Sequence, residues 1–126
     1  MKNSIRLTKQ QYAAGYDEHA GSFYRFALCV TGDKKQAEAA MAKLFCEGYT
    51  AQAEDSFTEH MIRVLRRILE SCPPNAEGYR QSIKMLLPDR KHQKLIELLC
   101  GLTIKQRAAL LQKLMLENSD EAKAAC

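Results

Sequence analysis

The sequence predicts an all-α fold, and three observations support this. Glycine and proline are scarce, with six and three copies in 126 residues, and tryptophan is absent. Alanine, leucine, lysine, glutamate and glutamine are abundant, and these residues favour helix over strand. Apolar residues recur every three to four positions, and residues that start or stop helices separate the recurring runs. We therefore expect helices only.

The first helix is expected from Thr8 to Val30. Its inner face should consist of Tyr12, Tyr16, Ala20, Phe23, Phe26, Ala27 and Val30. This spacing lines one side of a helix. Gly32 then provides a stop, and the carboxylate of Asp33 can accept the free N–H groups at the start of the next helix.

The second and third helices follow the same logic. The second should bury Ala37, Ala40, Met41, Leu44 and Phe45. After a polar stretch over residues 50–55, Ser56 and Glu59 match the reciprocal capping box that opens a helix. The inner face of this third helix should be Phe57, Met61, Val64, Leu65 and Ile68. Arg63, Arg66 and Arg67 fall away from most of that stripe.

A lobe boundary is expected after the third helix. Pro73 and Pro74 end it, and the small polar residues that follow lack apolar periodicity, as in a linker. We therefore divide the chain into a lobe over residues 1–72, a linker over 73–80 and a second lobe over 81–126.

The second lobe should hold three helices and a short final segment. One contains Ile83, Leu86 and Leu87. The next opens at Pro88 and should bury Leu95, Ile96, Leu98 and Leu99. Thr103 and Gln106 form another capping box, which starts a helix through Leu110, Leu111, Leu114 and Met115. Asn118 and Ser119 should break that helix and start a last segment of at most two turns over residues 120–126.

Composition and motifs argue against several functional classes. The formal net charge of +4 would assist an encounter with nucleic acid without requiring one. The five cysteines are odd in number and contain no C-x-x-C pair, so we expect no disulfide framework and a reducing compartment. The start of the chain lacks a secretion signal and no run is long enough to cross a membrane, so a cytoplasmic protein is expected.

No arrangement of residues predicts catalysis. His19, His60 and His92 lie on different helices, and none has a cysteine, serine or carboxylate at a spacing that indicates a catalytic group. We expect no enzyme activity, no cofactor and no metal site.

The arginines of the third helix have two interpretations. They can form a solvated face whose guanidinium groups pair with Glu59 or Glu70, which is the more common situation on helices. They can also contact phosphates, since a guanidinium fork matches phosphate oxygens whatever the base sequence.

The order of motifs in the first lobe resembles a known family. The chain contains Tyr16-Asp17-Glu18-His19, Phe23-Tyr24-Arg25-Phe26-Ala27-Leu28, Thr31-Gly32-Asp33, Ala37-Glu38, Phe45, and Phe57 leading to Ile62-Arg63-Val64. This string resembles the second conserved region of extracytoplasmic-function sigma factors of the sigma-70 family. The resemblance implies a three-helix bundle that binds the clamp of RNA polymerase and promoter DNA.

The second lobe is similar to the start of the family's fourth region. The matching residues are Leu102, Gln106-Arg107-Ala108-Ala109-Leu110-Leu111 and Asn118-Ser119-Asp120-Glu121-Ala122. The residues that would form a DNA recognition helix do not follow. The resemblance thus implies a short helical lobe like a truncated fourth region, without the helix that enters the major groove.

The resemblance also assigns surfaces. The polymerase-binding face would be Glu38, Ala39, Ala42 and Lys43, where the family usually has acidic and amide residues at the last three positions. The DNA-binding residues would be Arg63, Arg66, Arg67 and His60, with His60 near the position of a family tryptophan. We expect all of these side chains to point outward.

Three functional hypotheses follow. The first is a sigma-like regulator of transcription initiation whose partners are the RNA polymerase core and promoter DNA. The second is a degenerate sigma-like interaction module that competes with a sigma factor or binds an anti-sigma or other sigma-regulating protein. The third is a helical adaptor without a role in transcription. A homodimer is an open alternative, because Leu95, Leu98, Leu110, Leu114 and Met115 form more apolar surface than a short lobe can hide.

Overall fold

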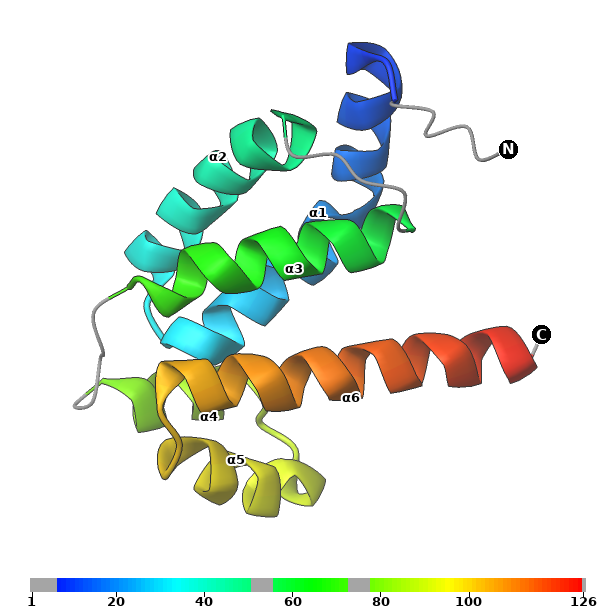
Figure 1. Cartoon of the computed structure of the whole chain (residues 1–126). Coiled ribbons are helices and arrows are strands. Elements are labelled where there is room, and N and C mark those ends of the chain that lie inside the picture. Colours follow the sequence, from blue (N-terminus) through cyan, green and yellow to red (C-terminus); the bar gives the residue numbers. More distant parts are fainter. Residues whose placement is uncertain (1–6, 51–55, 73–77, 126) are drawn as a thin grey trace.

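The computed structural model describes residues 7–50, 56–72 and 78–125, with side chains up to Leu114. The helices are α1 (Lys9–Thr31), α2 (Lys34–Thr50), α3 (Phe57–Glu70), α4 (Tyr79–Leu86), a 3₁₀ turn η1 (Arg90–His92), α5 (Gln93–Cys100) and α6 (Ile104–Ala125). No strand occurs in these ranges, so the predicted all-α class is confirmed. Figure 1 shows α1, α2 and α3 gathered at one side, with α6 running along α3.

Capping residues fix the helix ends, although the box at the start of α1 was not predicted. Thr8 and Gln11 form a reciprocal capping box at the start of α1. Gly32 ends α1 in the left-handed conformation, with φ at 64°, and its N–H donates to the carbonyl oxygen of Leu28 at 2.7 Å. Asp33 Oδ1 then accepts the N–H of Lys35 at 2.9 Å. The predicted turn at residues 31–33 is confirmed.

The later caps agree with the sequence as well. Ser56 Oγ accepts the N–H of Glu59 at 3.2 Å and starts α3, which is one of the two bonds of the predicted capping box. Thr103 and Gln106 bond each other reciprocally, at 3.0 and 3.2 Å, and start α6. The predicted break at Asn118 and Ser119 is wrong, because α6 continues to Ala125. Residues 104–125 contain no glycine or proline, and asparagine or serine within a helix costs only a fraction of a kcal/mol, roughly 0.5.

The larger core cluster joins α1, α2 and α3, and the start of α6 completes it. Phe23, Leu44, Met61, Ile62 and Leu65 are fully buried there. Ile104 and Ala108 of α6 belong to the same cluster. Most predicted inner-face residues are buried, but Phe45 was placed wrongly, since 41% of it is exposed. Its ring instead covers Tyr16, with centroids 4.9 Å apart.

A smaller cluster attaches α4 and α5 to the back of α1. It consists of Cys29, Tyr79, Ile83, Ile96 and Leu99. The prediction that Leu98 is buried was wrong, because 51% of it is exposed. Ile96 and Leu99 fill the inward positions of this two-turn helix, and Leu98 lies on its outer side.

In the structure, residues from both predicted lobes pack into one core. Residues 73–77 of the predicted linker lie outside the described residues, and Tyr79, assigned to the linker, is the first residue of α4. Because α6 packs on both α1 and α3, residues after the linker help to bury the first three helices.

Candidate functional site

The outer face of α2 carries the four residues assigned to polymerase binding. Glu38, Ala39, Ala42 and Lys43 are all exposed, whereas Ala37, Ala40, Met41 and Leu44 are buried. The outward orientation expected for these four is therefore confirmed. Two of the four residues are alanines, whose short side chains leave little between the α2 backbone and solvent.

The arginines of α3 differ from one another in their surroundings. Arg63 and Arg67 are exposed, but Arg66 is half-buried. The Nε of Arg66 lies 3.2 Å from the Glu70 carboxylate, and its Nη1 donates to Oε1 of Gln112 on α6 at 3.0 Å. Glu70 is one of the two partners predicted for these arginines on a solvated face. Arg66 thus connects α3 to α6, and a contact with phosphate would require it to leave both partners.

His60 is not part of the exposed face, and the expectation that it points outward was wrong. Only 6% of the residue is exposed, and its Nε2 lies 2.9 Å from the carbonyl oxygen of Gly48 at the end of α2. The ring satisfies a carbonyl in the last turn of α2, which has no partner within its own helix. In this arrangement His60 holds α2 against α3 and is unable to contact DNA.

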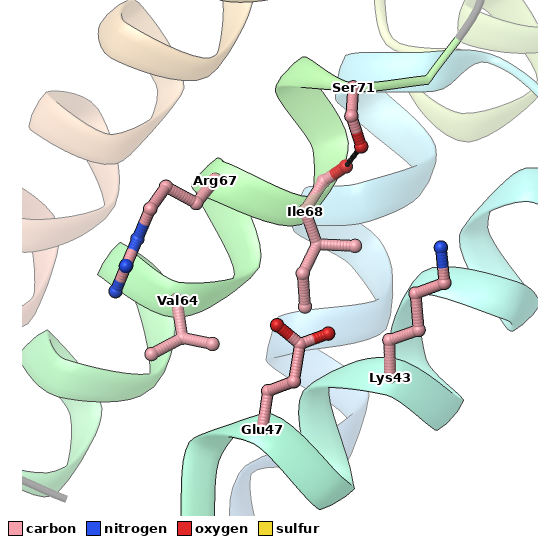
Figure 2. Close-up of a pocket in the computed structure, with 6 residues that line it drawn as sticks. All are labelled: Lys43, Glu47, Val64, Arg67, Ile68 and Ser71. Atoms are coloured by element: carbon pink, nitrogen blue, oxygen red, sulfur yellow. Dashed lines mark hydrogen bonds between the residues drawn. The ribbon is translucent and has the colours of Figure 1, made fainter. Parts of the chain in front are cut away.

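A groove between α2 and α3 joins the two predicted surfaces. Its volume is about 210 Å³, and it is lined by Lys43, Glu47, Val64, Arg67, Ile68 and Ser71 (Figure 2). Lys43 comes from the expected polymerase-binding face, and Arg67 comes from the expected DNA-binding set. Val64 and Ile68 form an apolar floor because they continue the buried stripe of α3.

The charges of this groove are one carboxylate and two cations. Figure 2 shows the Glu47 side chain rising from α2 between those of Lys43 and Arg67. Within the ranges that the structure describes, neither cation forms an ion pair. At the edge of the groove Ser71 Oγ donates to the carbonyl oxygen of Ile68 at 2.7 Å. The two cations can therefore accept an anion, and the carboxylate limits the affinity.

Sequence reasoning missed a buried polar cluster formed by Tyr79 and Arg107. The Tyr79 hydroxyl donates to the carbonyl oxygen of Cys29, and burial raises the pKa of this phenol. The Arg107 guanidinium lies 3.5 Å from the centre of the Tyr79 ring. It also donates to the carbonyl oxygens of Leu99 at 2.8 Å and Val30 at 3.3 Å. The arginine that matched a family motif at the sequence level therefore has a structural role here.

This cluster connects α1, α4, α5 and α6 and so fixes the second half of the chain on the first. The charge of Arg107 is satisfied by two carbonyl dipoles and a ring face, which is an arrangement that stabilises buried guanidinium groups. The sequence carried one signal for this cluster. Arg107 lies between apolar neighbours on the inner face of α6, and an arginine that is buried in this way must be paired.

The described part of the chain contains neither a metal-binding cluster nor a membrane-spanning helix. No three histidine, cysteine or acidic side chains within it lie close enough to bind a metal ion. Its helices also include none with the length and hydropathy needed to cross a membrane.

Comparison with known proteins adds no assignment. The chain has no significant match to a protein-family model, to a curated protein or to a solved structure.

Proposed function

We propose that the protein is a sigma-like transcription factor whose α1–α3 bundle binds RNA polymerase and contacts promoter DNA. In this proposal the outer face of α2 binds the polymerase clamp. Lys43, Arg67 and Arg63 contact DNA phosphates. The supporting observation is the groove between α2 and α3, in which Lys43 and Arg67 lie without ion pairs and open to solvent.

The chemistry of the groove suits a phosphate backbone better than a base edge. A guanidinium and an ammonium provide several donors for phosphate oxygens, and such contacts carry no sequence information by themselves. Glu47 would repel the same phosphates, so the affinity should be modest. With two or three phosphates neutralised, the logarithm of the binding constant should fall with the logarithm of salt concentration with a slope of about −2 to −3.

The first experiment measures binding of the purified protein to core RNA polymerase and to a fork-junction promoter probe at several salt concentrations. Arg67→Gln should reduce the magnitude of the salt slope by about 0.9, because one phosphate contact is lost. Glu47→Gln should raise DNA affinity, because a repulsive carboxylate is removed. Lys105→Gln, which removes an exposed cation of α6 away from the groove, is the matched control and should change neither value. If Arg67→Gln and Glu47→Gln behave like the control, DNA does not bind in this groove.

Lys43→Glu separates the two partners. Lys43 lies both on the outer face of α2 and in the groove, and the resemblance implies an acidic residue near its position on the clamp-binding face. The variant should therefore bind polymerase more tightly and DNA more weakly. A parallel change in both dissociation constants would contradict the assignment of Lys43 to two surfaces.

A second candidate function is an interaction module that competes with a sigma factor or binds its regulator. The packing of α6 on α3 favours it. The bond from Arg66 to Gln112 withdraws one of the three arginines from the surface, and α6 continues as one helix where a recognition helix would require a turn. This candidate predicts that the purified protein fails to bind core polymerase but binds a sigma factor or an anti-sigma protein in the same assay.

A further inference from the structure

A second hollow lies between α1, α5 and α6, away from the groove of α2 and α3. Its volume is about 320 Å³. Six of the residues that line it are apolar or weakly polar: Phe26, Cys29, Leu87, Leu95, Leu111 and Leu114. The four leucines are only half-buried, although they are large enough to fill a core. This apolar groove is therefore partly hydrated in the single chain.

One cation stands at the rim of the apolar groove. Arg25 is exposed, and the described residues provide it with no ion pair. Ser22, one turn earlier on α1, is the other polar residue of the lining. A ligand that fits this groove should therefore combine an apolar side with a carboxylate at the position of Arg25.

The chain itself contains a segment with this chemistry. Helix α6 continues over residues 115–125, eleven residues past the last groove residue, which corresponds to about 16 Å of helix. In the sequence, Leu114, Met115 and Leu116 are followed by Glu117, Asp120 and Glu121, with no cation between residues 117 and 121. Because the first half of α6 is packed in the core, these residues extend a helix that is already nucleated and can reach beyond the chain's own surface.

We infer that the apolar groove binds the end of α6 from a second copy of the chain, in a two-fold symmetric dimer. The direction of α6 permits this. Arg107 contacts the carbonyl of Val30 near the end of α1, and Leu111 and Leu114, further along α6, line the groove with Phe26 and Ser22, so α6 crosses α1 in the opposite sense. An antiparallel pair of α6 helices that crosses near Leu114 extends each acidic end along the groove of the other copy, beside Arg25. The interface is isologous, so each contact occurs twice.

The association state of the full chain tests the inference, measured by sedimentation equilibrium under reducing conditions. The unmodified protein should dimerise reversibly. Leu114→Glu should abolish dimerisation, whereas Lys113→Glu, a substitution at an exposed neighbour with a larger change of charge, should leave it unchanged. Helix content and thermal midpoint by circular dichroism verify that both variants are folded.

A charge exchange distinguishes this dimer from any other. Arg25→Glu should weaken dimerisation about tenfold or more, because two attractive contacts become repulsive. The triple variant Glu117→Arg, Asp120→Arg and Glu121→Arg should weaken it similarly. An equimolar mixture of the two variants should dimerise again, because each groove then faces an end of opposite charge.

Three outcomes overturn the inference. The first is a monomer at all concentrations in the unmodified protein. The second is a dimer that tolerates Leu114→Glu. The third is a mixture of the two charge variants that stays monomeric although the unmodified protein dimerises. This result would mean that the dimer interface lies elsewhere.

Discussion

Replacing Gly32 with alanine should destabilise the fold strongly, and replacing Gly21 with alanine should stabilise it. Gly32 has a φ of 64°, and a Cβ atom at this residue would lie 2.5 Å from Cδ1 of the Tyr79 ring and 3.2 Å from the Tyr79 Cα. Gly21 lies within α1 on its exposed side, and a Cβ there meets nothing within 4 Å. The two substitutions add the same methyl group to the same helix region.

The magnitude at Gly32 has two parts. An alanine in the left-handed region costs about 1 kcal/mol or more. The Tyr79 ring must also move, although it is 1% exposed and bonded to Cys29 and Arg107. Loss of one hydrogen bond and one cation–π contact costs about 2 kcal/mol together. The total is about 3 kcal/mol, which in a chain of this size lowers the thermal midpoint by roughly 12 °C.

The control should move in the opposite direction. Gly21→Ala should stabilise the protein by about 0.8 kcal/mol, because alanine is the better helix former and no neighbour has to move. Urea unfolding followed by circular dichroism measures both variants. A double variant with Tyr79→Leu, compared with Tyr79→Leu alone, removes the ring contact and should reduce the cost of Gly32→Ala to the backbone part.

Two results would contradict this account of the turn at Gly32. If Gly32→Ala were as stable as the unmodified protein, the turn would not depend on the left-handed residue or on Tyr79. If its cost were the same with and without the Tyr79 ring, the close approach of α4 to this turn would have no energetic effect.

Three further predictions concern single groups. Burial raises the pKa of Tyr12 to about 12, and its hydroxyl donates to the carbonyl oxygens of Leu44 and Phe45. Because this pKa lies above the unfolded value near 10, the protonated phenol contributes its full stabilisation below pH 10, and this stabilisation is lost as pH rises towards 12. Urea unfolding at a series of pH values should show a smaller alkaline loss of stability in Tyr12→Phe. His60→Ala should cost about 2 kcal/mol in the same assay, because the Gly48 carbonyl loses its partner and a cavity remains, whereas an unchanged midpoint would mean that water replaces the ring. Thr103→Ala should lower the free energy of unfolding by about 1 kcal/mol, because it removes the capping box of α6. A loss below about 0.3 kcal/mol would show that packing alone determines where this helix starts.

The candidate site was predictable only in part. The outward orientation of Lys43 and Arg67 follows from helical periodicity, since both lie opposite the apolar stripes of their helices. Their joint position in one groove depends on how α2 crosses α3, which no spacing in the sequence specifies. His60 shows the same limit: it shares a helix face with Val64 and Ile68, so its burial had a signal, but its partner is a carbonyl at the end of another helix.

Local patterns in the sequence were enough to predict the helices and most of their ends. Periodicity acts over three to four residues, and a cap such as Thr103 with Gln106 acts over one turn, so both are readable without knowing the neighbours. Three features became visible only in the folded chain: α6 belongs to the first core, Arg66 bonds α6, and Arg107 and Tyr79 join the two parts of the chain. Those contacts link residues from 28 to 77 positions apart in the chain, and their geometry arises from helix packing that local sequence does not encode.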